Sequence, residues 1–296
     1  MRAPSWMLGL TVAVLMASVV GLQAVRERTA NLTTVSADLL YVRSPEAMKR
    51  LALSYDDLLA DIYWMRAVQF YGSTKLSGDP YRSYGLLYPL LDVTTSLDGF
   101  FNVAYHFGSL FLAEPPPGGP GRPDQAIALL EKGLVVQPTK WEFAQAIGFV
   151  HYWWYEDYPE AASWFDRSAK MSGAPIWMAA LAAVTHAEGG GRETSRQLWR
   201  QIQATGEEAW YRREAVRRLS QLDAMDQIDE LAGLVAAFER RRGERPDDWN
   251  RLVAAGDLRG VPLDPMGQAY RLVDGVVSLD PSSRLLPLPK TGGQRR

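Results

Sequence analysis

The sequence has no cysteine and only three histidines among its 296 residues. Without cysteine, the chain cannot form disulfide bonds, bind a metal through thiolates or carry the lipid of a lipoprotein. It also lacks an excess of either charge: the formal net charge is −2, and lysine and arginine are dispersed along the chain. No nucleic-acid partner is therefore expected. The hydrophobic fraction of 47% and the charged fraction of 22% are typical of a folded protein with a substantial core.

Motifs of catalysis and metal binding are absent as well. The sequence contains neither the nucleophile elbow Gly-x-Ser-x-Gly nor the zinc motif His-Glu-x-x-His. The triple glycine Gly189–Gly191 is not followed by Lys-Ser/Thr, so it predicts a turn between helices and not a phosphate loop. The histidines lack an acidic residue at ligand spacing, which favours packing roles over a metal site; they are His106, His151 and His186. We expect no enzyme, no cofactor and no metal.

Paired acidic residues are the remaining candidates for acid–base chemistry. Each pair lies where a helix is predicted to start or end, and helix caps and solvated turns explain such pairs better than a catalytic dyad does. The pairs are Asp56–Asp57, Glu156–Asp157 and Asp247–Asp248.

Residues 6–25 form an uncharged apolar run, preceded by Arg2 and followed by Arg26 and Arg28. About 20 residues is the length at which a helix spans a bilayer. We therefore expect a retained membrane anchor; a cleaved signal peptide and a buried core helix are the alternatives. An N-terminal apolar segment is ordinarily an export signal, so the bulk of the chain is expected outside the cytoplasm, in the periplasm of a bacterium.

Small and apolar residues recur at fixed offsets between residues 123 and 175. Ala126 is followed by Leu130, Gly133 and Pro138, and the first three offsets return in Ala161, Phe165 and Ser168, with Pro175 two residues late. Gly148 lies between the two sets. Small residues allow helix axes to approach, Phe165 can fill the space between helix pairs, and proline ends the second helix of a pair.

This pattern resembles the tetratricopeptide repeat, in which a first helix has an apolar-Gly pair and a second helix has Ala-x3-aromatic before a proline. Residues 54–72 also resemble the opening of membrane-anchored bacterial tetratricopeptide proteins. The resemblance implies an all-α fold, a right-handed α-solenoid of about four helix pairs, because one pair cannot bury its apolar faces alone.

Four helix pairs can be placed along the chain. The first is expected to open at Ser44-Pro45-Glu46, pass a loop at residues 73–80 and end at residues 97–99. The second spans residues 101–138, with the insertion Pro115–Pro120 as a surface loop. The third spans residues 141–175. The fourth begins at Ile176, turns at Gly189–Gly191 and continues through Ser195, Trp199 and Ile202.

The repeat pattern fades after residue 205, while helical periodicity continues to a glycine stop at Gly243. Residues 270–278 predict a β-hairpin with a type I′ turn at Asp274-Gly275, which must lean on the last helices and cap the solenoid. The expected organisation is an anchor or signal segment (1–28), a linker (29–43), repeats (44–205), C-terminal helices and hairpin cap (206–280) and a disordered tail (281–296).

The resemblance also implies where a partner binds, because the first helices of this family line a concave groove. The repeat alignment places polar and aromatic side chains on that face, namely Gln69, Asn102, Tyr105, Glu142, Gln145, Phe149 and Tyr152. Such residues can hydrogen-bond and stack on a protein or peptide. We expect a membrane-tethered scaffold or assembly factor; an enzyme of envelope or polysaccharide metabolism with an atypical helical site is the alternative.

Overall fold

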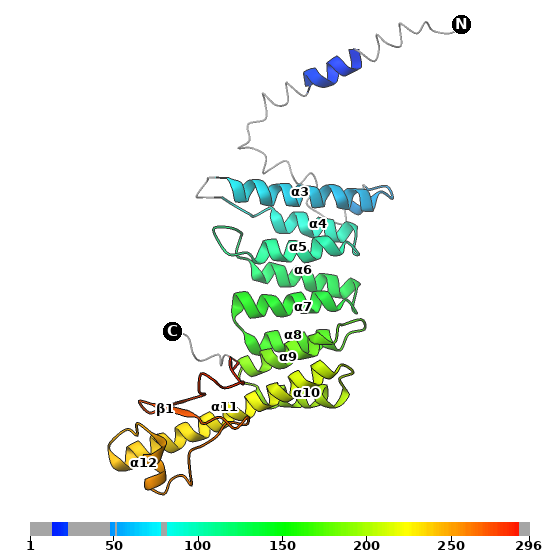
Figure 1. Ribbon diagram of the computed structural model, residues 1–296. Coiled ribbons are helices and arrows are strands. Elements are labelled where there is room, and N and C mark those ends of the chain that lie inside the picture. The colour runs from blue at the N-terminus through cyan, green and yellow to red at the C-terminus, as the bar shows by residue number, and fades with distance from the viewer. Residues whose placement is uncertain (1–13, 23–47, 51, 78–81, 290–296) are drawn as a thin grey trace, which may run out of the picture. The chain divides into compact units, whose positions relative to one another are not determined.

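A computed structural model describes residues 14–22, 48–50, 52–77 and 82–289. Across these residues the fold is all-α apart from one small two-stranded sheet, which confirms the predicted class (Figure 1). The chain forms two compact units, Met1–Arg122 and Pro123–Arg296. Of the predicted anchor, the structure describes only residues 14–22, which are helical and exposed; the predicted linker at 29–43 lies outside the described residues.

The first unit contains α3 (Asp56–Leu76), α4 (Leu87–Leu97) and α5 (Asn102–Ala113), and each helix packs on the next. The helix predicted to run on from Ser44 is interrupted, because Leu53 and Ser54 have positive φ angles of 48° and 77°. A new helix, α3, then starts with two aspartates in its first turn. Their negative charges stabilise the helix by interacting with the positive end of its dipole. The α3 helix also continues to Leu76, into the predicted loop.

The proline-rich insertion after α5 is non-helical, as predicted. Hydrogen bonds hold it to its own unit in the middle of the loop and just after it. The Tyr84 hydroxyl donates to the Gly118 carbonyl at 2.9 Å, and the Arg122 N–H donates to the Leu112 carbonyl at 2.8 Å. The insertion is thus a bound surface loop of the first unit.

The second unit begins with α6 (Pro123–Val136) and α7 (Trp141–Val150), which continues as a π-helical turn, η1 (His151–Tyr155). Next come α8 (Tyr158–Ala169), α9 (Trp177–Glu188) and α10 (Arg192–Thr205). These helices pack in chain order, each against the next (Figure 1). The triple glycine forms the turn between α9 and α10, as predicted, and Asp157 caps α8 by accepting a hydrogen bond from the Glu160 N–H.

The repeating positions that fall inside α6, α8 and α10 are all buried in the structure, whereas Pro138 is exposed and Pro175 is half-buried. The second helices of the last three predicted pairs each contribute three of them to the core: Ala126, Leu130 and Gly133 from α6; Ala161, Phe165 and Ser168 from α8; Ser195, Trp199 and Ile202 from α10.

Close packing around Phe165 shows why one position requires glycine. Phe165 is fully buried and meets Phe149 edge-on, with 5.1 Å between ring centroids. A Cβ atom at Gly148 would lie 2.5 Å from the Phe165 ring and 3.2 Å from the Ala161 carbonyl oxygen. The ring therefore occupies the space that a side chain at Gly148 would need, and α7 and α8 approach through that glycine.

The C-terminal part of the second unit is built on α11 (Ala209–Arg242), which ends at Gly243 with φ 74° as predicted. Its first half shares a buried cluster with α9 and α10. Its second half packs against α12 (Trp249–Ala254) and a hairpin of β1 (Arg271–Val273) and β2 (Val276–Ser278). Antiparallel pairing joins Val273 to Val276 across Asp274 and Gly275, whose φ angles of 53° and 76° fit the predicted type I′ turn.

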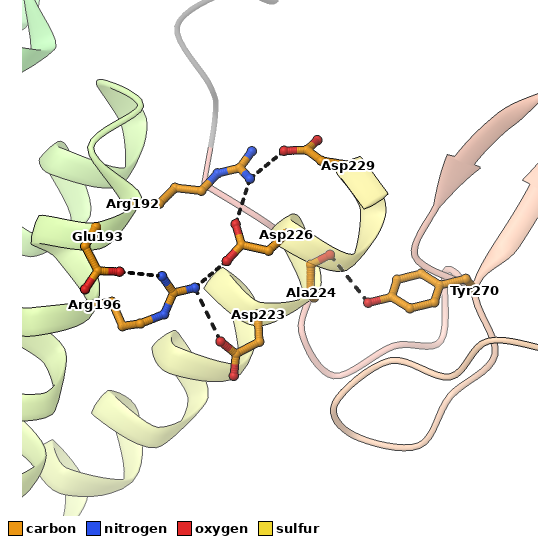
Figure 2. Close-up of polar contacts among 8 residues, drawn as sticks. All are labelled: Arg192, Glu193, Arg196, Asp223, Ala224, Asp226, Asp229 and Tyr270. Atoms are coloured by element: carbon orange, nitrogen blue, oxygen red, sulfur yellow. Dashed lines mark hydrogen bonds and ion pairs between the residues drawn. The ribbon is translucent and has the colours of Figure 1, made fainter. Parts of the chain in front are cut away.

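Ion pairs join α10 to α11 beside that hairpin (Figure 2). The Arg192 guanidinium lies 2.9 Å from Asp226 and 2.6 Å from Asp229, and Arg196 pairs with Asp223 and Asp226. Burial alone would raise the pKa of the Asp226 carboxyl, but hydrogen bonds from the two arginines outweigh it and lower that pKa.

The segment expected to be disordered from residue 281 is instead packed on α11 up to the end of the described chain. Leu285 is fully buried in the same cluster as the hairpin. The Gln221 side-chain amide donates to the carbonyls of Leu285 and Pro287 at 2.6 and 2.8 Å. The local sequence does not predict this packing, because the hydrogen-bond donor, Gln221, lies more than 60 residues earlier in the chain. Residues 290–296 lie outside the described part.

Candidate functional site

The predicted groove residues fall in both units, three in the first and four in the second. In the first unit, Gln69 is exposed on α3 and Asn102 is half-buried at the start of α5. Tyr105 is 0% exposed, and its hydroxyl donates to the Thr95 carbonyl at 3.4 Å. Burial raises its pKa to about 12. Tyr105 is therefore a core residue and not a surface contact, which corrects the prediction: its side chain points into the α4–α5 packing and not toward solvent.

The four predicted residues of the second unit lie on one helical face. Glu142, Gln145, Phe149 and Tyr152 recur at spacings of three and four along α7 and η1, and all are half-buried. Each is therefore partly exposed, while the rings of Phe149 and Tyr152 also pack against the buried cluster around Phe165. This face, defined by these four residues, is called the α7 face below.

The α7 face continues onto α9 through two contacts with the same offset. The rings of Trp141 and Trp177 meet edge-on at 6.2 Å, and the Tyr152 hydroxyl donates to the Glu188 carboxylate at 2.8 Å. Each contact joins residues 36 positions apart, one pair near the helix starts and the other near their ends. The two helices therefore run parallel, in matching register, with their partly exposed rings on a shared surface.

Tyr152 is held as a neutral hydrogen-bond donor. Burial, followed by the hydrogen bond to the Glu188 carboxylate, raises the pKa of its hydroxyl far above the ordinary value of 10.0. Its ring also packs edge-on against Tyr158 at 5.1 Å. The residue thus ties η1 to α8 and α9, and holds the end of the α7 face in place.

The η1 turn projects aromatic side chains that the repeat alignment did not select. Trp153 is 64% exposed and Tyr155 is 46% exposed. The turn ends at Glu156, which has a left-handed φ of 51°. The run His-Tyr-Trp-Trp-Tyr is the sequence signal for these rings, but helical spacing does not show their direction, because a π-helical turn changes the direction of each side chain.

A cavity of about 420 Å³ lies among α8, α9, α10 and the start of α11. Apolar side chains such as Ala179, Leu198 and Ile202 line it, together with polar residues such as Lys170 and Gln201. Its residues come from separate segments, so no local motif marks it.

Asp166, which also lines this cavity, pairs with a histidine in a way that the sequence did not predict. The His186 Nε2 atom lies 2.9 Å from an Asp166 carboxylate oxygen and joins α9 to α8. The acid stands 20 residues before the histidine, beyond any local ligand spacing. Over the described parts of the chain, no group of three histidine or acidic side chains is arranged to hold a metal ion.

Comparisons with protein-family models, curated proteins and solved structures give no match to this chain. In the portion that the structure describes, no helix has both the length and the apolar character needed to cross a membrane.

Proposed function

We propose that this protein is a membrane-tethered tetratricopeptide-type scaffold or assembly factor that holds a partner protein on the α7 face and the adjoining part of α9. The observation that carries this proposal is the shared surface of partly exposed rings and hydrogen-bonding side chains on two parallel helices. Aromatic residues in a fixed, partly desolvated setting are the side chains that most often dominate protein–protein affinity.

The packing of the second unit supports the repeat architecture behind this proposal. Burial of all nine repeating positions on α6, α8 and α10, and the matching register of α7 and α9, are what stacked helix pairs require. A right-handed solenoid of about four pairs, with the hairpin as its cap, is the arrangement we propose for the whole chain.

The tether is proposed from the uncharged run at residues 6–25. An export-type segment at this position also supports placing the folded units outside the cytoplasm, in a bacterial periplasm. A scaffold in this position would keep its partner close to the membrane.

The proposal is tested by affinity capture of the full-length protein after mild cross-linking in its native membrane. We expect a stoichiometric partner that is lost, by tenfold or more, when Gln145→Arg places a long charged side chain in the middle of the α7 face. Trp210→Ala is the matched surface control, since Trp210 is 53% exposed at the start of α11, outside this face. Capture that is equal for both variants, or turnover of an envelope polysaccharide without any partner, would refute the proposal.

A further inference from the structure

The η1 turn combines exposed aromatic rings with carboxylates and lacks a positive charge. Residues 141–166 contain no lysine or arginine, but they include five acidic residues: Glu142, Glu156, Asp157, Glu160 and Asp166. Asp157 and Glu160 are exposed beside the turn, and neither forms an ion pair with any residue that the structure describes. Glu142 and Asp166 pair with Lys140 and His186, so among the described residues it is Asp157 and Glu160 whose negative charge is not offset by an ion pair beside Trp153 and Tyr155.

Elsewhere in the described chain, aromatic rings are contacted by the cationic side chains of arginine and lysine. The Arg167 guanidinium lies 4.9 Å from the Trp164 ring, and Arg66 and Lys75 lie over the rings of Tyr63 and Tyr71 at 5.2 and 5.3 Å. Within the described residues no cation lies over Trp153 or Tyr155, whose only ring neighbours are Tyr152 and His151. Their outer faces are open to solvent and to a cation from another molecule.

We propose that the η1 turn recognises an arginine- or lysine-bearing segment of the partner protein. A guanidinium or ammonium group is attracted to the face of an indole or phenol ring, and a neighbouring carboxylate strengthens the contact through charge. This inference names the chemistry of the partner and rests on the function proposed above. An exposed Trp and Tyr can also enter a lipid headgroup region, but the adjacent carboxylates oppose contact with an anionic membrane surface.

The test measures binding of a fluorescent arginine-containing peptide to the full-length protein in detergent, by anisotropy. The same peptide with citrulline in place of arginine keeps the shape and removes the charge. One variant removes the rings (Trp153→Ala with Tyr155→Ala). A second removes the charge with little change in shape (Asp157→Asn with Glu160→Gln), and asparagine can still cap α8.

Each variant has a matched control in the same unit. Trp210→Ala removes an exposed ring elsewhere, and Glu230→Gln with Asp274→Asn removes two exposed charges elsewhere. We expect the arginine peptide to bind wild type and both controls alike, and to bind each test variant about tenfold more weakly. Circular dichroism should show equal helicity for all proteins.

Equal binding of the citrulline peptide, or equal weakening by the controls, would overturn the inference. If the ring variant loses the captured partner but peptide binding ignores charge, the scaffold function stands and cation recognition fails. If peptide binding follows the expected pattern while capture of the partner is unchanged by the same variants, the basic segment does not belong to that partner. Much tighter peptide binding after deletion of residues 290–296, which include Lys290, Arg295 and Arg296, would assign the turn to the chain's own basic segment instead.

Discussion

The contact between Gly148 and Phe165 allows a test with two substitutions. Gly148→Ala is expected to destabilise the wild type, but not a variant that lacks the Phe165 ring. Phe165 is fully buried, so Phe165→Ala removes a packed ring and should cost about 3–5 kcal/mol in the free energy of unfolding. Stacked helices stabilise mainly their nearest neighbours, so backbone amides should lose protection from hydrogen exchange mostly in α7 to α10.

Gly148→Ala in the wild type places a methyl group 2.5 Å from the Phe165 ring. Overpacking of this kind costs about 1–3 kcal/mol, while replacing glycine by alanine inside a helix returns about 1 kcal/mol. The net effect is expected to be destabilising by up to about 2 kcal/mol. Once Phe165→Ala has removed the ring, the two nearest atoms are gone, the Ala161 carbonyl oxygen remains at 3.2 Å, and the methyl group fills part of the cavity. Gly148→Ala should then be neutral or stabilising by up to about 1 kcal/mol.

The assay is a double-mutant cycle by urea unfolding followed by circular dichroism, with hydrogen exchange to locate the effect. Phe100→Ala is the control, since the Phe100 side chain is largely exposed and should change stability by less than about 0.5 kcal/mol. Additive effects of the two substitutions, or a Phe165→Ala variant as stable as wild type, would show that this ring does not pack against Gly148 as described.

Three further predictions concern other parts of the chain. Carbonate extraction should leave the protein in the membrane fraction if residues 6–25 are retained as an anchor, and an N-terminal sequence starting near residue 22 or 25 would instead indicate a signal peptide. Gln221→Leu should release residues 281–289 from α11, seen as faster hydrogen exchange there at a cost of about 1–3 kcal/mol, because the buried Leu285 carbonyl and the part-buried Pro287 carbonyl lose their donor; unchanged exchange would contradict this. The folded-state pKa of Asp226 lies below its ordinary value of 3.8, so its ion pairs stabilise the α10–α11 junction above that pH and the contribution is lost as the pH falls through the lowered pKa. Asp226→Asn should therefore flatten the acid limb of the stability profile below pH 3.8, and an identical limb in both proteins would refute the role of this carboxylate.

The sequence by itself determined the helical class, the buried positions of α6, α8 and α10, the glycine stop after α11 and the turn of the hairpin. These features depend on local rules: helical spacing of apolar residues, the need for glycine or a tolerant residue at positive φ, and the volume of a side chain at a helix contact. The close packing of Gly148 and Phe165 could be predicted because the two helices that carry them are adjacent in the sequence.

Only the tertiary structure decided which of the predicted surface residues are accessible. Helical spacing groups Tyr105 with residues on one face of its helix. It does not show whether that face is exposed or packed against another helix. The order of residues 281–289 and the pairing of His186 with Asp166 likewise depend on partners 20 to 66 positions away. Side-chain direction in η1 depends on the π-helical turn, which local propensity did not indicate. Packing between segments distant in the sequence, and not local propensity, therefore set which of these side chains are exposed.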